Sequence, residues 1–138
     1  MKKVLGLVGS MLIVTFLLTA CGTEGSANRE VSSDALIGMW HAASAEVVYD
    51  VTGLDTIEAV SLIFNEDGTG IEAWVDMWES EFELYFLWEL ESETLKTLAV
   101  DEKGQPISEA VWFNSTFEID DDQLMITGVM FGGDWIRD

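Results

Sequence analysis

The sequence predicts an all-β domain over residues 34–138, most simply an antiparallel up-and-down β-barrel of about eight strands. Apolar and polar residues alternate over many short segments, which is the period of a β-strand. Turn-forming residues separate these segments at short intervals, and no long segment has a helical period. Strands joined by short turns pair antiparallel, and closing them into a barrel removes exposed edges. An open, strongly curved sheet or a sandwich is the alternative.

Eight segments carry the strand pattern. They are residues 39–50, 58–65, 70–78, 81–90, 94–100, 107–119, 123–130 and 134–137. The fourth segment is the clearest, because five apolar side chains recur at every second position: Phe82, Leu84, Phe86, Trp88 and Leu90. Turns are expected at residues 65–70, 101–106 and 120–122, and Gly68 and Gly70 suit positive φ angles in the first of them.

The N-terminus has the features of an export signal. Lys2 and Lys3 precede an apolar run over residues 4–18, which is shorter than the roughly 20 residues of a membrane-spanning helix. The following residues, Leu18-Thr19-Ala20-Cys21, closely resemble the lipobox of bacterial lipoproteins. This resemblance implies that residues 1–20 are a cleaved signal peptide and that Cys21 receives a diacylglyceryl group.

A lipid on Cys21 implies an extracytoplasmic protein anchored to a membrane. That membrane is the cytoplasmic membrane, on its outer face, or the outer membrane if the cell has two. Two acyl chains hold a protein durably, whereas one holds it only marginally. Residues 21–33 are small and polar, so we expect a flexible tether. Cys21 is the only cysteine of the chain, which leaves no internal disulfide.

The chain is strongly acidic, with 26 acidic and 6 basic residues and a formal net charge of −20. Lys2 and Lys3 leave with the signal, so the mature chain is more acidic still. Nucleic acids and anionic lipid surfaces are recognised by basic patches, and the composition argues against both as partners. Cationic partners or divalent cations are compatible with it, as is a simple role of the charge in solubility.

The ends of the domain resemble a known family. Gly38-Met39-Trp40 opens the first strand, Trp135-Ile136-Arg137 closes the last, and residues 62–70 form a strand and a glycine-containing turn between them. This pattern is similar to the small lipocalin-like domains of bacterial lipoproteins. The resemblance implies that Trp40 plugs one end of the barrel and that Arg137 packs on it as a cation–π pair. The chain is shorter than full lipocalins and lacks the helix that packs on their barrel, so ligand transport does not follow from the likeness.

Few residues suggest chemistry, and we predict no catalytic residue, no metal site and no cofactor. His41 is the only histidine, and as the neighbour of Trp40 it should face the opposite side of the strand. A single histidine satisfies neither a catalytic triad nor a zinc ligand set. The acidic residues at 65–68 and 120–122 lack the spacing of a calcium loop and are read as turns.

One surface suggests binding. A two-residue turn at Glu79-Ser80 would place Val75 opposite Leu84 on an apolar face. The other face would then gather aromatic and acidic side chains on the outside of the barrel: Trp74, Asp76, Trp78, Glu83 and Tyr85. Such a surface could bind a sugar or a cation. The alternative is that the aromatic residues pack against another element while the carboxylates face water.

Two functional hypotheses follow. In the first, the domain is a non-enzymatic binding module that holds a small hydrophobic or amphipathic ligand inside the barrel, with residues 51–57 as a lid. In the second, it is an envelope interaction or structural lipoprotein with a filled barrel. Its outer face or acidic loops would then bind a protein, glycan or cation. An enzyme is the least supported class, because no nucleophile is paired with a base and no two carboxylates stand out.

Overall fold

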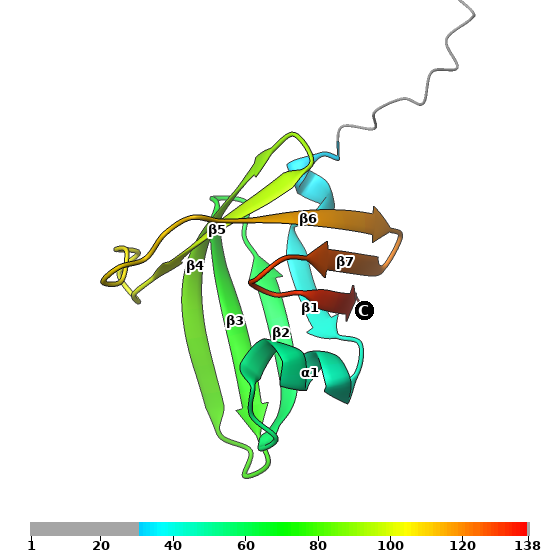
Figure 1. The fold of residues 1–138 in the computed structure, drawn as a ribbon, viewed down its shortest axis with the longest axis vertical. Helices are drawn as coiled ribbons and strands as arrows, with labels where there is room; N and C mark the ends of the chain where they lie inside the picture. The colour runs from blue at the N-terminus through cyan, green and yellow to red at the C-terminus, as the bar shows by residue number, and fades with distance from the viewer. Residues whose placement is uncertain (1–30, 138) are drawn as a thin grey trace, which may run out of the picture.

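The computed structural model describes residues 31–137, which form a closed barrel of eight strands, each antiparallel to its sequence neighbours (Figure 1). The strands are β1 (Gly38–Ala42), β2 (Ile57–Phe64), β3 (Thr69–Asp76), β4 (Glu81–Glu91), β5 (Thr94–Val100), β6 (Phe113–Asp120), β7 (Gln123–Thr127) and β8 (Gly133–Ile136). β1 and β8 close the barrel by pairing Ala42 with Trp135. The predicted up-and-down barrel is confirmed, and the open-sheet and sandwich alternatives are wrong. The expected signal peptide and Cys21 lie outside the described residues.

The folded domain includes the end of the segment expected to be a tether. Val31 packs against the core, and Ser32 caps the short 3₁₀ helix η2 (Ser33–Ala35). The next residue, Leu36, is fully buried. Residues 31–33 therefore belong to the domain.

The first predicted strand, residues 39–50, is wrong in its second half. β1 ends at Ala42, and an α-helix, α1 (Ala45–Thr52), follows it. Ser44 caps the helix by accepting a hydrogen bond from the Val47 backbone N–H, and Gly53 ends it at φ 68°. Val47 and Val48 enter the core. With only eight residues, the helix is too short to show a clear helical period in the sequence.

The β2–β3 turn uses its two glycines in different ways. Gly68 has the expected positive φ, 82°. Gly70 lies inside β3 and does not need a positive φ. It is required for space, because a Cβ atom there would lie 2.2 Å from the Phe86 ring on the neighbouring strand.

The strands β2, β3 and β4 extend beyond the rest of the barrel, as Figure 1 shows. β5 begins to pair with β4 only at Tyr85, where Tyr85 faces Val100, so the first residues of β4 have no neighbour on that edge. The five apolar residues predicted to point one way on β4 alternate as expected, but their burial differs. Phe86 and Trp88 are buried, whereas Phe82 and Leu84 are 50% and 48% exposed. This extension of the sheet is therefore open to solvent.

Two later strands are shorter than predicted. Residues 101–112, expected partly in the sixth strand, form a loop that returns along β5 through a bridge between Val100 and Pro106. β6 begins only at Phe113, and β7 ends at Thr127 rather than at residue 130. This loop borders a cleft beside β4.

Candidate functional site

The centre of the barrel is filled by aromatic side chains. The Phe64 ring lies 5.5 Å from the Phe86 ring and 5.4 Å from Trp88, both in edge-to-face arrangements. Phe131, from the β7–β8 loop, lies 4.9 Å from Phe86. These rings are part of the buried core that the strands enclose.

A cleft of about 420 Å³ opens where β5 parts from β4. This volume lies within the range of roughly 300–1,000 Å³ that is usual for small-molecule sites. Most of the lining is apolar, and we call the site the β4 cleft. Its walls include Leu84, Phe86, Ala99, Ile107, Met130 and Phe131. A second cleft, of about 470 Å³, lies over β6–β8 and is lined largely by exposed side chains such as Glu118, Asp120 and Asp134.

Glu72 supplies a buried carboxylate to the β4 cleft. It lies on the inner face of β3, opposite Leu84 on β4 and Leu62 on β2, and is 5% exposed. The Trp74 Nε1–H donates a hydrogen bond of 2.7 Å to its Oε1. Burial raises the pKa of Glu72, and the bond from Trp74 opposes this only in part. An acid whose pKa is shifted by burial inside a cleft is a candidate functional group.

Asp76, two positions from Trp74 on the same face of β3, has a structural role instead. Its Oδ1 accepts hydrogen bonds from the backbone N–H groups of Trp78 at 2.9 Å and Ser80 at 2.8 Å. These bonds hold the β3–β4 turn, in which Glu79 adopts a φ of 63°. The two buried carboxylates of β3 therefore differ, since Asp76 is satisfied by its own hairpin whereas Glu72 faces a cleft.

The outer-face binding surface predicted from the sequence is wrong, because the β3–β4 register differs from the expected one. Trp74 faces Phe82 and Glu72 faces Leu84, which places Trp74 and Asp76 on the inner face. Glu83 and Tyr85 remain outside, where the Tyr85 hydroxyl donates a 2.6 Å hydrogen bond to Glu83 Oε2. This bond is the main cause of a raised Tyr85 pKa. Trp78 lies in the turn, 69% exposed. The five residues do not share one surface.

The sequence contained a signal for the true register. The signal is Asp76, because an aspartate side chain at the start of a turn can accept hydrogen bonds from backbone N–H groups that follow it. Here those groups belong to Trp78 and Ser80, and the turn takes four residues rather than two. A register shift by an odd number of residues exchanges the two faces of a strand. The buried Glu72 was missed for this reason.

The contact predicted between Trp40 and Arg137 is present. The Arg137 guanidinium lies 4.0 Å from the centre of the Trp40 ring, and its Nη2 donates a 2.5 Å hydrogen bond to the Ala35 carbonyl. Trp40 is fully buried, and its indole N–H donates to the Leu36 carbonyl at 2.9 Å. These contacts connect η2 and Leu36 to Trp40 on β1 and to Arg137, which follows β8.

The remaining candidates have structural partners. His41 faces away from the core, as predicted, with Nδ1 at 2.8 Å from the Ser61 hydroxyl. Asp67 accepts hydrogen bonds from the Thr69 hydroxyl at 2.6 Å and the Thr69 backbone N–H at 3.0 Å, which lower the pKa of Asp67. Asp67 thus stabilises the β2–β3 turn. Across residues 31–137, no three His, Cys, Asp or Glu side chains are grouped so that they could hold a metal ion.

Residues 51–57, expected to act as a lid, do not line the β4 cleft. They belong to the end of α1 and the loop into β2, and α1 packs on β2, β8 and β1. In the part of the chain that the structure describes, no helix is long and apolar enough to cross a membrane. Comparison of the chain with family models, with curated proteins and with solved structures gave no match.

Proposed function

We propose that this chain is an exported lipoprotein, anchored through a diacylglyceryl group on Cys21, whose barrel is a non-enzymatic binding module for a small amphipathic ligand. The ligand would occupy the β4 cleft rather than the centre of the barrel. One observation carries the binding part of the proposal: the Glu72 carboxylate is buried in an apolar cleft that is open to solvent.

The energetics of Glu72 support a binding role. Burying a carboxylate without an ionic partner lowers stability, and a single hydrogen bond from Trp74 offsets this only partly. An apolar residue at this position would suit the surrounding Leu62 and Leu84 better. Specific ligand sites typically combine an apolar lining with a few placed polar groups, which is the composition of this cleft.

A neutral apolar fluorophore, N-phenyl-1-naphthylamine, tests the cleft directly. Residues 22–138, which contain the whole barrel, should bind it at one saturable site with a rise in fluorescence. Leu84→Lys should abolish this binding, because Leu84 lines the cleft and its partial exposure lets the barrel accept a charge. Ile136→Lys is the matched control, since Ile136 is 41% exposed on β8, outside the cleft. Unsaturable binding, or equal binding by Leu84→Lys and wild type, would refute the proposal.

The anchor requires a separate test on the full chain expressed in a bacterial host. We expect it in the membrane fraction, with a mass that corresponds to loss of residues 1–20 and gain of a diacylglyceryl group. Cys21→Ser should release the protein from that fraction into a soluble one. A soluble wild-type chain without added lipid mass would exclude lipidation.

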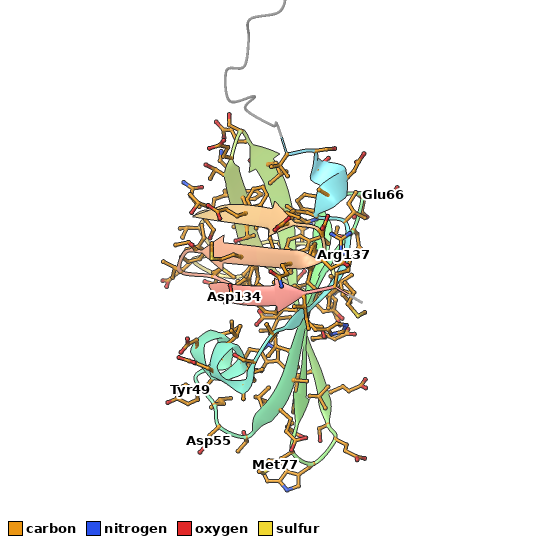
Figure 2. The ribbon with its side chains drawn as sticks, turned by 90° about the vertical axis from the view of Figure 1, so that its right-hand side faces the viewer. Tyr49, Asp55, Glu66, Met77, Asp134 and Arg137 are labelled. Atoms are coloured by element: carbon orange, nitrogen blue, oxygen red, sulfur yellow. The ribbon has the colours of Figure 1, made fainter. Side chains whose placement is uncertain are left out.

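A second candidate function, a protein-interaction module, is favoured by the end of the β3–β4 hairpin. Met77 and Trp78 are 50% and 69% exposed there, and Phe82, near the start of β4, is exposed as well. Figure 2 shows Met77 at the end of the molecule opposite Glu66, which lies near the first described residues. A partner that meets this tip would be lost on Trp78→Ser, whereas binding of the fluorophore would be unchanged.

A further inference from the structure

We infer that the ligand of the β4 cleft carries a cationic amine, whose ammonium group pairs with the Glu72 carboxylate while its apolar body lies against Leu84, Phe86 and Phe131. This inference rests on the proposed function and names the chemical class of ligand for the same site.

The part of the chain that the structure describes provides no cation for Glu72. Within residues 31–137 the basic side chains are Lys96, Lys103 and Arg137, and none forms an ion pair with Glu72. Lys96 is engaged by Glu89 and Glu91 on the outside of the barrel. Arg137 is held over the Trp40 ring and bonded to the Ala35 carbonyl. An ammonium group on a ligand would supply the missing charge and would be held in an apolar environment, where ion pairs are strong.

Glu72 is also oriented for such a contact. The indole N–H of Trp74 fixes one carboxylate oxygen at 2.7 Å, and the described residues give the other oxygen no hydrogen-bond partner. Glu72 forms part of the cleft wall, so a ligand in the cleft can reach it. A carboxylate held in this way accepts from an N–H donor without first losing conformational freedom.

The mouth of the cleft is acidic. Three exposed acids surround it, namely Glu83, Asp101 and Glu102. Their negative potential, added to the net charge of −20, attracts cations and repels carboxylate or phosphate head groups. A fatty acid or phospholipid would thus meet repulsion at the mouth and a buried like charge inside. An amine meets attraction at both places.

Three probes of equal chain length separate these classes: octylamine, octanol and octanoate. Each is titrated as a competitor of N-phenyl-1-naphthylamine at pH 7.5. Octylamine should compete about ten- to hundredfold more effectively than octanol, which is the gain expected from a hydrogen bond to a charged group. Octanoate should be the weakest competitor. The matched variants are Glu72→Gln, which removes the inner charge, and Glu83→Gln, which removes one at the mouth.

In Glu72→Gln, octylamine should compete only about threefold more effectively than octanol, or less, while octanol still competes. In Glu83→Gln, most of the wild-type preference for octylamine over octanol should remain. Equal competition by octylamine and octanol against the wild type would overturn the inference, although saturable fluorophore binding would leave the proposed function standing. A preference for octylamine over octanol in Glu72→Gln that equals the wild-type preference would also overturn the inference. Failure of the fluorophore itself to bind would refute the proposed function. If Glu72→Gln does not fold, the preference of the wild type for octylamine over octanol is measured at several pH values instead. It should decrease as the pH falls and Glu72 is protonated, and a preference that does not change would overturn the inference.

Discussion

Replacement of Arg137 by glutamine should destabilise the barrel, because Arg137 follows β8 and contacts both β1 and η2. Its guanidinium lies 4.0 Å from the Trp40 ring centre, a cation–π contact of about 0.5–2 kcal/mol. Its Nη2 donates to the Ala35 carbonyl, and a charged hydrogen bond contributes about 1.5–3 kcal/mol. The Arg137 Nε is buried without a partner, which offsets about 1–3 kcal/mol of this gain. We therefore expect a net loss of about 1–3 kcal/mol.

The loss is measured by urea unfolding, as a lower midpoint at an unchanged slope. A double-mutant cycle with Trp40→Leu then isolates the cation–π contact, and we expect a coupling energy of about 0.5–2 kcal/mol. The control cycle pairs Arg137→Gln with Trp78→Leu, because Trp78 is exposed in the β3–β4 turn. The control pair should be additive within about 0.5 kcal/mol. Coupling to Trp40 that is no larger than coupling to Trp78 would refute the reasoning.

Substitutions at Gly70, Glu72 and Ser44 test packing, titration and helix capping. Gly70→Ala should lower the free energy of unfolding in urea by about 1–3 kcal/mol, because the added Cβ would lie 2.2 Å from the Phe86 ring. The loss should be smaller in a Phe86→Leu background. Equal losses in both backgrounds would exclude the clash as the cause. Burial raises the pKa of Glu72 above its ordinary 4.5, so the folded state favours the protonated carboxyl group. The resulting contribution to the free energy of unfolding is present in full below pH 4.5 and is lost as the pH rises through the folded-state pKa. Glu72→Gln should therefore gain stability relative to wild type with rising pH, and parallel pH profiles between pH 4 and 8 would contradict this. Ser44→Ala should cost about 0.5–2 kcal/mol by removing the N-cap of α1, as seen in thermal unfolding, whereas no change would mean that the cap is replaced by water.

The sequence was sufficient for the architecture and insufficient for the site. Strand alternation has a period of two, so segments such as β4 and β5 could be recognised without any knowledge of their neighbours. The eight-stranded order followed from short turns alone. The helix α1 was missed because eight residues that follow a strand with similar composition give little periodicity. The contact of Arg137 with Trp40 was expected only from a family resemblance, since the two residues lie at opposite ends of the domain.

The site was missed because it depends on register, which the pattern of apolar residues left ambiguous. On β3 the residues Ile71, Ala73 and Val75 alternate with Glu72 and Trp74, so the apolar set is the natural choice for the interior. The structure places that set outside and the polar set inside. The turn that accompanies this register is held by the side chain of Asp76.

The same register explains why a ligand site lies at the edge of this barrel and not in its centre. Because Gly70 points inward and has no side chain, the Phe86 ring can enter the space beside it and meet Phe64 and Phe131. Those rings fill the centre of the barrel. Two residue pairs further along the two strands, Glu72 faces Leu84, which is 48% exposed because β5 has already left β4. At this point of the β3–β4 pair, the inner face passes from the filled barrel to solvent. The buried carboxylate and the exposed apolar surface therefore meet there. An amphipathic cation requires both of these surfaces, and neither the filled centre nor the exposed hairpin tip offers the two together.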